Sequence, residues 1–314
     1  MVSQLDLAQR DLLSLLDFTP AEVREIIETA VQLRANPHRY QSALAGKTLF
    51  MYFEKPSLRT RVTFETGMTQ LGGHAIYYTA SDGKIGERES VADVARNLER
   101  WVDGAMCRTF SHEMLQELAD VASIPVINGL TDFLHPCQAL ADYQTLAQVK
   151  GGVAGLPGRR LVYIGDGNNV AHSLMAGGAK LGVHVTVICP PGNEPDADQL
   201  AACQKAGEET GAKIDVQNDM EAVAGADAVY TDVWASMGQE DEAAARDRVF
   251  RPYQVNQAVM DKAGEESIFM HCLPAHRGDE VTDEVADSPR SVIFQEAENR
   301  LHAQKAVMLL TMAG

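Results

Sequence analysis

The chain has 314 residues, of which 45% are hydrophobic, and its formal net charge at pH 7 is -17. This length predicts two domains with real cores, and the acidic balance argues against nucleic acid as a partner because a phosphate backbone favours a basic surface. No apolar stretch reaches the roughly 20 residues of a membrane helix, and no signal peptide is apparent. We therefore expect a cytoplasmic protein that does not associate with a membrane. The five cysteines are odd in number and lack CxxC spacing, which predicts reduced thiols and neither a disulfide frame nor a zinc site.

Helical and strand-like segments alternate along the first half of the chain. A helix is expected to begin at Thr19 and Pro20, where a cap residue and a first-turn proline precede an apolar stripe. Four strands are expected, at Thr48–Phe53, His74–Tyr78, Gly104–Phe110 and Pro125–Ile127. Helical patterns lie between them, including Ser90–Val102. Such alternation predicts a parallel sheet with helices on both faces.

A glycine-rich stretch at residues 150–158 separates this half from a second alternating series. The expected strands of that series are Arg160–Ile164, His184–Cys189, Ala226–Thr231 and Ser267–Cys272. The predicted fold is α/β, with two doubly wound domains of parallel sheets over residues 1–150 and 151–296. A C-terminal helix over residues 297–314 is expected to return to the first domain.

The segment Ser57–Arg61, which reads Ser-Leu-Arg-Thr-Arg, combines hydroxyls and arginines at the start of a predicted helix. Ser57 stands at the N-cap position, so backbone N–H groups and the helix dipole favour an anion there, with phosphate the first candidate. Arg108 ends the third expected strand and could join this site from a neighbouring strand end. The alternatives are an arginine-rich helix start on a solvated surface and, for Arg108, an ordinary surface arginine.

Two further polar segments follow strand ends. His135 and Gln138 lie three residues apart on one helix face, where both can hydrogen-bond a carbonyl or amide group or simply cap the helix. The segment Gly165–Asn169 resembles a dinucleotide-binding turn, but Val170 stands in place of the third glycine of GxGxxG. The next strand also ends without an acidic residue for a ribose, so a nicotinamide cofactor is disfavoured. The two asparagines suit a zwitterionic ligand better.

The last polar segments contain an aspartate, a His-Cys pair and an arginine. Asp232 follows a predicted strand and could pair with an ammonium group, or be an ordinary strand-end aspartate. His271 and Cys272 are adjacent and lack the spacing of zinc ligands. A cysteine hydrolase would need an activating histidine, which His276 could supply only if the turn brought it back. Arg300, taken alone, reads as part of a charged helix face.

Together these segments closely resemble the ornithine carbamoyltransferases over essentially the whole chain. The resemblance is carried by the arginine loop, His-Pro-x-Gln, Asp-Gly-Asn-Asn, Asp-x-Trp-x-Ser-Met-Gly and His-Cys-Leu-Pro. It implies transfer of the carbamoyl group of carbamoyl phosphate to the δ-amine of L-ornithine, giving L-citrulline and phosphate, in arginine biosynthesis. It also implies no metal, no organic cofactor, and a homotrimer or a multiple of trimers whose sites are shared between neighbours.

The resemblance also implies the role of individual residues. The implied carbamoyl phosphate ligands are Ser57, Leu58, Arg59, Thr60, Lys84, Arg108, His135, Gln138, Cys272, Leu273 and Arg300. The implied ornithine ligands are Asn169, Asp232, Ser236 and Met237. The implied catalytic residues are Arg108, His135 and Cys272, with the thiol orienting the amine and not acting as a covalent nucleophile. The Leu273–Pro274 peptide bond is implied to be cis.

Two positions depart from the usual family pattern. Leu58 replaces a threonine and so removes one hydroxyl, while its backbone N–H remains. Lys84 stands where many relatives have glutamine or histidine, and the related aspartate carbamoyltransferases use a lysine in the equivalent loop. The resemblance places this loop in the neighbouring subunit's carbamoyl phosphate site. The alternatives left open are transfer to putrescine, aspartate or an acylated ornithine, and a catalytically silent binding subunit.

Overall fold

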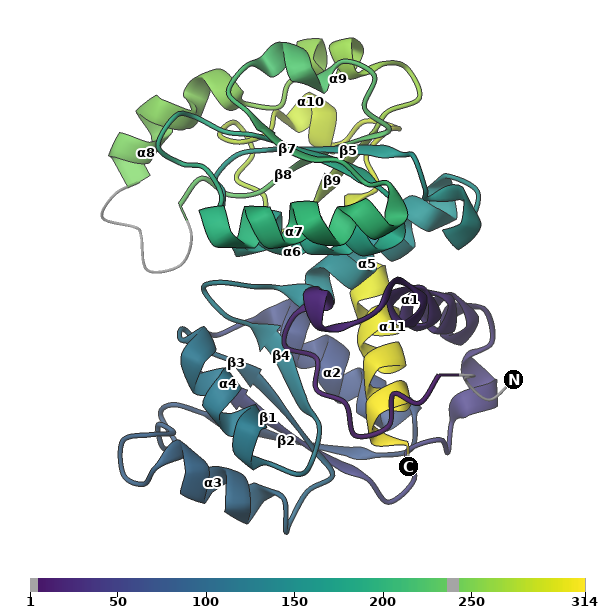
Figure 1. Ribbon diagram of the computed structural model, residues 1–314, viewed down its shortest axis with the longest axis vertical. Coiled ribbons are helices and arrows are strands. Elements are labelled where there is room, and N and C mark those ends of the chain that lie inside the picture. Colours follow the sequence, from purple (N-terminus) through teal and green to yellow (C-terminus); the bar gives the residue numbers. More distant parts are fainter. Residues whose placement is uncertain (1–4, 236–242, 314) are drawn as a thin grey trace. The chain divides into compact units, whose positions relative to one another are not determined.

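The computed structural model describes residues 5–235 and 243–313, and the chain forms two compact units. Unit 1 comprises Met1–Gln144 and Glu298–Gly314, and unit 2 comprises Thr145–Ala297. Each unit contains one parallel sheet whose two faces are covered by helices (Figure 1). The doubly wound α/β fold expected from the sequence is confirmed. Within the described ranges, no helix combines the length and apolarity needed to cross a bilayer.

Unit 1 is built on a four-stranded sheet of order β2-β1-β3-β4. Its strands are β1 (Thr48–Phe53), β2 (His74–Thr79), β3 (Gly104–Arg108) and β4 (Val126–Leu130). Its helices are α1 (Pro20–Ala35), α2 (Leu58–Gln70), α3 (Val91–Leu98), α4 (His112–Val121), most of α5 (Pro136–Val149) and most of α11 (Ile293–Met312). Short 3-10 turns lie at Leu15–Asp17 and Pro37–Tyr40.

Unit 2 is built on a five-stranded sheet of order β7-β6-β5-β8-β9. Its strands are β5 (Arg160–Ile164), β6 (His184–Ile188), β7 (Ile214–Gln217), β8 (Ala228–Thr231) and β9 (Ile268–His271). Its helices are α6 (Asn169–Leu181), α7 (Ala197–Thr210), α8 (Ala243–Phe250), α9 (Gln257–Ala263) and α10 (Asp283–Ala286). Short 3-10 turns lie at Val153–Gly155, Met220–Val223 and Arg251–Tyr253.

The first helix begins where the sequence predicts. Thr19 accepts the Glu22 N–H through its hydroxyl, and the Glu22 carboxylate accepts the Thr19 N–H in return, which completes a capping box. Pro20 occupies the first turn, where its missing N–H costs nothing. The apolar stripe behind it is buried in unit 1.

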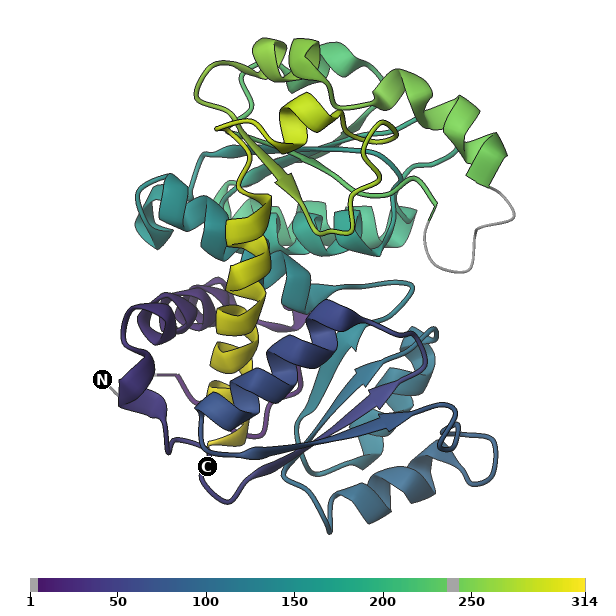
Figure 2. The ribbon, with the colours of Figure 1, turned by 180° about the vertical axis from the view of Figure 1, so that it is seen from behind.

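The C-terminal helix returns to unit 1, as expected, but begins earlier. It starts at Ile293, four residues before the predicted start at Ala297. From Glu298 onward it belongs to unit 1 and lies beside α1 and α2 (Figure 2). The buried Lys305 donates to Gln70 Oε1 of α2 at 2.9 Å, and Glu298 forms an ion pair with Arg34 of α1.

Two strands of the first sheet end two or more residues away from their predicted ends, whereas β2 is longer by one residue. β3 ends at Arg108 and not at Phe110, because the Phe110 N–H donates to the Glu54 carboxylate at 2.9 Å and leaves the ladder. β4 continues to Leu130, past the predicted end at Ile127. The polar Asn128 is tolerated inside this buried strand because its amide donates to the Leu13 carbonyl at 3.0 Å.

The four-residue edge strand β7 has no counterpart among the strands expected from the sequence. Ile214 is buried, whereas Asp215 and Gln217 are exposed. Because an edge strand of this length needs only two inward-facing apolar residues, its pattern is too short to distinguish from a loop. The strand nevertheless pairs in parallel with β6 over its whole length.

Both sheets change winding direction between two neighbouring strands. In unit 1 the change falls between β1 and β3, and in unit 2 it falls between β5 and β8. Loops leaving the carboxyl ends of such a pair diverge to opposite faces of the sheet and leave a crevice suited to a ligand. Ser57–Arg61 and Arg108 lie at the ends of the first pair, Gly165–Asn169 and Asp232 follow the second, and the segments at His135 and Cys272 follow the neighbouring strands β4 and β9.

Candidate functional site

The start of α2 forms the centre of the first group of predicted residues. Ser57 is the N-cap, and its hydroxyl accepts the Thr60 N–H at 3.3 Å. Thr60 is fully buried, and its hydroxyl accepts a hydrogen bond from Arg300 Nη2 of α11 at 3.2 Å. The Leu58 side chain is 77% exposed, so it does not fill the space in front of the helix start. The amino end of α2 is therefore joined by a guanidinium from a helix distant in sequence.

A chain of buried hydrogen bonds extends from Arg300 into α5. Arg300 Nη1 donates to Gln138 Oε1 at 2.6 Å, and Gln138 Nε2 donates to Asp142 Oδ1 at 2.7 Å. All three side chains are almost fully buried. Since a guanidinium can only donate, it determines which end of the Gln138 amide faces it.

His135 lies in the electrostatic field of the same group. Burial is the main reason that the pKa of His135 lies well below its ordinary value. Three guanidinium groups lower this pKa further, and they belong to Arg300, Arg108 and Arg59. The imidazole is therefore neutral at pH 7, and its ring nitrogens offer one donor and one acceptor. The structure thus brings side chains of α2, the end of β3, the start of α5 with the residue before it, and α11 into one group: Arg59, Thr60, Arg108, His135, Gln138 and Arg300.

The two arginines in the first turn of α2 have different surroundings. Arg61 pairs with Glu65 at 3.0 Å, and its guanidinium lies 3.7 Å from the centre of the Tyr77 ring. Arg59 is half-buried and makes no ion pair within residues 5–235 and 243–313. Arg61 is thus occupied by protein groups, whereas Arg59 carries a charge that a bound anion would neutralise.

Lys84 lies in the loop after β2. Its side chain is 48% exposed, and its Nζ is 3.4 Å from Glu87 Oε1. Across the described part of the chain, Lys84 makes no hydrogen bond or ion pair to Ser57–Thr60. The loop is nonetheless anchored, because the Ile85 N–H donates to the Tyr52 hydroxyl at 3.2 Å.

Lys55 supports this site and was missed in the sequence. Its side chain is buried, pairs with Asp132 and lies with Nζ 4.2 Å from the centre of the Phe110 ring. These contacts tie together the loops that follow β1, β3 and β4. A lysine next to the arginine loop was the available signal, but its partners are distant in sequence.

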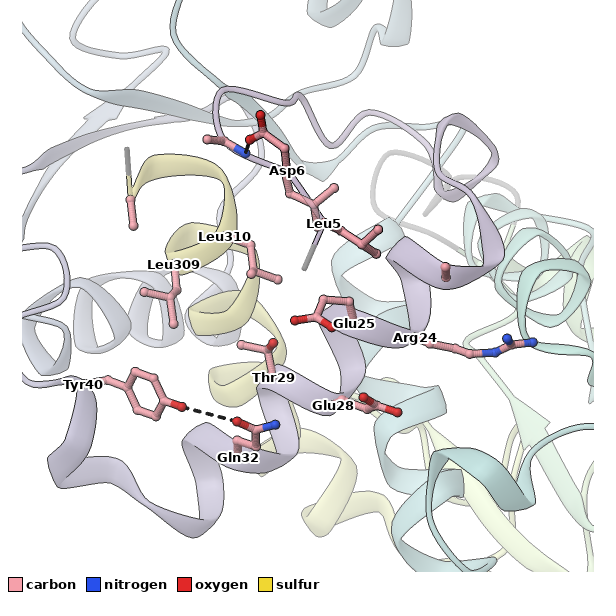
Figure 3. Close-up of a pocket in the computed structure, with 14 residues that line it drawn as sticks. Leu5, Asp6, Arg24, Glu25, Glu28, Thr29, Gln32, Tyr40, Leu309 and Leu310 are labelled. Carbon is pink, nitrogen blue, oxygen red and sulfur yellow. Dashed lines mark hydrogen bonds between the residues drawn. The ribbon is translucent and has the colours of Figure 1, made fainter. Parts of the chain in front are cut away.

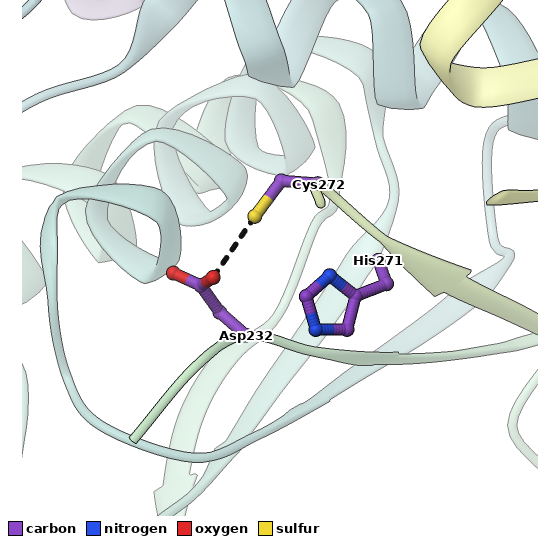
Figure 4. Close-up of side chains that lie close together, drawn as sticks. All are labelled: Asp232, His271 and Cys272. Carbon is purple, nitrogen blue, oxygen red and sulfur yellow. Dashed lines mark hydrogen bonds between the residues drawn. The ribbon is translucent and has the colours of Figure 1, made fainter. Parts of the chain in front are cut away.

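Asp232 is the centre of the second group, in unit 2. Asn168 Nδ2 donates to Asp232 Oδ2 at 3.0 Å. The Cys272 thiol donates to Asp232 Oδ1, also at 3.0 Å, as Figure 4 shows. Asn168 also caps α6 by accepting two of its first N–H groups. It was missed as an individual site residue, although the pair of asparagines pointed to it. Asp232 is only 7% exposed, so its charge can be felt strongly by a cation.

Asn169, Ser236 and Met237 complete the predicted ornithine ligands. Asn169 begins α6 directly beside the Asn168 cap. Ser236 and Met237 lie outside the described residues. The Leu273–Pro274 peptide bond is cis, which confirms the prediction.

His271, Cys272 and Asp232 each bring a potential metal-ligand atom within 4.8 Å of the others. Both ring nitrogens of His271 are already engaged. Nδ1 accepts the Leu273 N–H at 2.8 Å, and Nε2 lies 3.2 Å from Glu280 Oε1. The Cys272 thiol in turn donates to Asp232. As arranged, the three side chains form a hydrogen-bonded group, and the expected absence of a metal stays a prediction.

Gly167, in the glycine turn after β5, lies close against the chain's own backbone. A Cβ on Gly167 would lie 2.2 Å from the Pro195 nitrogen and 2.4 Å from the Glu194 carbonyl carbon. The close approach that this glycine allows is thus to the chain's own backbone. This agrees with the missing third glycine and again disfavours a dinucleotide.

A cavity of about 940 Å³ lies elsewhere in unit 1 (Figure 3). It is bordered by the segment 5–8, α1, Tyr40 and the end of α11. Its polar lining includes the carboxylates of Asp6, Glu25 and Glu28, together with Arg24 and several uncharged polar side chains. No predicted site residue lines it among the described residues, so its volume supports neither the anion site at α2 nor the group around Asp232.

Comparisons with known proteins agree with this geometry. Residues 10–148 match the carbamoyl-P binding domain of the aspartate/ornithine carbamoyltransferases, and residues 157–311 match their Asp/Orn binding domain. The ornithine carbamoyltransferase of Thermococcus kodakarensis is 53% identical over 99% of this chain and 98% of that protein. The anabolic ornithine carbamoyltransferase of Pyrococcus furiosus is 52% identical over the same shares.

Solved structures give the same result. The structure of the ornithine carbamoyltransferase from Pyrococcus furiosus has a TM-score of 0.95 and 51% identity, covering 99% of both chains. That from Giardia lamblia has a TM-score of 0.87 and 39% identity, covering 96% of this chain and 97% of the other. With both halves of the sequence matched, the chain belongs to the aspartate/ornithine carbamoyltransferase family.

Proposed function

We propose that this protein transfers the carbamoyl group of carbamoyl phosphate to the δ-amine of L-ornithine, giving L-citrulline and phosphate. The observation that carries the proposal is the division of charge between two groups of residues in one chain. Unit 1 gathers guanidinium groups around a helix start, which suits a phosphate. Unit 2 presents the buried carboxylate of Asp232, which suits an ammonium group. We assign residues 1–150 to carbamoyl phosphate, 151–296 to ornithine, and 297–314 to the first of these domains.

Carbamoyl phosphate is held by the residues around α2. The backbone N–H groups at Ser57–Thr60 and the charges of Arg59, Arg108 and Arg300 bind the phosphate. Arg108 and the neutral imidazole of His135 hydrogen-bond the carbonyl oxygen, on which negative charge grows during attack. Gln138 binds the carbamoyl amide. Leu58 contributes its backbone N–H in place of the family's threonine.

Ornithine is bound through Asp232, Asn169, Ser236 and Met237, with the ammonium group on Asp232. The δ-nitrogen must be neutral to attack the carbamoyl carbon. Its lone pair forms the new C–N bond, the C–O bond to phosphate breaks, and the proton lost by nitrogen leaves with the phosphate. Cys272 orients the amine and Leu273 the carbamoyl group, so most of the acceleration comes from positioning and charge stabilisation.

We infer that the active assembly is a homotrimer or a multiple of trimers. Lys84 supports this proposal, because its exposed position and its lack of contact with Ser57–Thr60 in its own chain suit a role in a neighbouring subunit's site. A lysine there adds positive charge beside the phosphate. A place in arginine biosynthesis is supported by the anabolic name of the Pyrococcus furiosus relative.

The proposed function is tested by offering the purified protein labelled carbamoyl phosphate with four acceptors in parallel: L-ornithine, L-aspartate, putrescine and N-acetyl-L-ornithine. We expect a carbamoylated product with L-ornithine and rates at least about 100-fold lower with the others, because buried polar groups of the site would lose their partners. If another amine were carbamoylated faster than L-ornithine, that amine would be the acceptor and the proposed substrate would be wrong. Binding of carbamoyl phosphate with no turnover of any amine would indicate a silent binding subunit.

The two arginines at the start of α2, Arg59 and Arg61, provide a matched pair of variants. Arg59→Ala should lower kcat by roughly two to three orders of magnitude, because it removes a charge that stabilises the developing phosphate. Arg61→Ala should have a much smaller effect, since Arg61 is already paired with Glu65 and packed on Tyr77. Steady-state kinetics on both variants checks this. Equal, mild losses would remove the anion site from the start of α2.

Asp232→Asn should act on one substrate. We expect a higher KM for ornithine, with a lower kcat if the amine is mispositioned, and an unchanged affinity for carbamoyl phosphate. The amide keeps an acceptor for Asn168 but lacks the charge that pairs with an ammonium group. Substrate-dependent initial rates and calorimetric titration with carbamoyl phosphate separate the two effects. Ornithine kinetics like those of the wild type would make Asp232 a structural residue.

A further inference from the structure

Glu280 is a buried carboxylate with no role in the proposed reaction steps. Its side chain is fully buried, and Oε1 lies 3.2 Å from Nε2 of the equally buried His271. The same oxygen accepts the backbone N–H of His276. Glu280 therefore connects the end of β9 to the middle of the loop that follows it, on either side of Cys272 and Leu273.

These contacts determine the protonation of the His271 ring. The Leu273 backbone N–H can only donate, and it points at Nδ1 at 2.8 Å, so Nδ1 carries no proton. A neutral imidazole must then carry its proton on Nε2, which faces the Glu280 carboxylate. The carboxylate thus selects the tautomer that leaves Nδ1 free to accept from Leu273.

The backbone held by this tautomer is unusual. Leu273 has a φ of 58°, in the left-handed region that residues with a Cβ rarely occupy. Such a conformation persists only when the surroundings hold it in place. The His271 ring holds Leu273 from one side, and the His271 N–H is itself held by Glu296 Oε2 at 3.0 Å. Cys272 lies between these two anchored residues, and its thiol donates to Asp232.

We propose that Glu280 is a positioning residue that, through the Nε2-protonated tautomer of His271, fixes the Leu273 backbone and directs the Cys272 thiol towards Asp232. The proposal rests on the proposed function, in which Cys272 and Leu273 orient the reacting groups. Within the described part of the chain, the side-chain hydrogen bonds of Glu280 go to His271 and to the His276 N–H and to none of the proposed substrate ligands, so it acts through His271 and the loop backbone.

Two variants of Glu280 separate the effect of its hydrogen-bond acceptor from the effect of its negative charge. Glu280→Gln keeps a carbonyl oxygen where Oε1 accepts from His271 and His276, whereas Glu280→Met removes the acceptor at similar volume. Thr282→Val is the matched control in the same loop. Thr282 stands at the N-cap of α10, but its hydroxyl makes no capping hydrogen bond and has no other partner within the described residues, so its loss should leave the kinetics unchanged.

The first measurement is spectroscopic and does not depend on turnover. Long-range proton–nitrogen correlation spectra of histidine-labelled protein distinguish a protonated ring nitrogen from an unprotonated one. The signal of His271 among the nine histidines is assigned by its loss in His271→Asn. We expect protonation on Nε2 in the wild type, Glu280→Gln and Thr282→Val, and a mixture of tautomers in Glu280→Met.

The second measurement is kinetic. Glu280→Met should lower kcat by roughly 100-fold, as expected for a small misplacement of reacting groups, and should raise the KM for ornithine. Its calorimetric affinity for carbamoyl phosphate should match that of the wild type. Glu280→Gln should restore most of kcat, and Thr282→Val should behave as the wild type.

The outcomes separate this proposal from the proposed function. A proton on Nδ1 in the wild type, or wild-type kinetics in Glu280→Met, would overturn the positioning role. Equal loss of carbamoyl phosphate affinity and kcat in Glu280→Met would indicate general structural damage and would also overturn it. A wild-type protein with the expected tautomer that forms no citrulline would instead overturn the proposed function, and with it the kinetic half of this proposal.

Discussion

The parallel arrangement of both sheets is the constraint on which the rest of the structure depends. Parallel strands end at one common edge, and the reversal of winding between β1 and β3, or between β5 and β8, sends the following segments to opposite faces. Residues far apart in sequence therefore meet at that edge. In unit 1 the edge assembles Thr60, His135 and Gln138, to which α11 adds Arg300. In unit 2 it assembles Asn168, Asp232 and Cys272.

Local charge outweighs the overall charge of the chain. Although the net charge is -17, guanidinium groups around the start of α2 act at close range and away from bulk water, where electrostatic interactions are stronger. The same guanidinium groups, together with burial, keep His135 neutral. The imidazole can therefore hydrogen-bond a substrate without adding a further positive charge to the group. The buried carboxylate at the centre of the second group, Asp232, belongs to unit 2 and not to this cluster.

Much of this could be predicted from the sequence, and the failures have physical causes. Long apolar strands and capped helices were located because their signals are local, as at Thr19 and β1. The edge strand β7 and the far end of β4 were not, because their stability comes from partners elsewhere in the chain, such as Leu13 for Asn128. The supporting residues Lys55, Asn168 and Glu280 were missed for the same reason. Their importance lies in contacts with distant residues, which spacing in a single sequence does not reveal.

The central claim is that the start of α2 is the phosphate site of this enzyme. A crystal structure of the protein with carbamoyl phosphate bound tests it most directly. We expect phosphate oxygens within hydrogen-bond distance of the backbone N–H groups at residues 58–60 and of the guanidinium groups of Arg59, Arg108 and Arg300. A phosphate bound in unit 2, against the start of α6, with nothing bound at the start of α2, would contradict the claim.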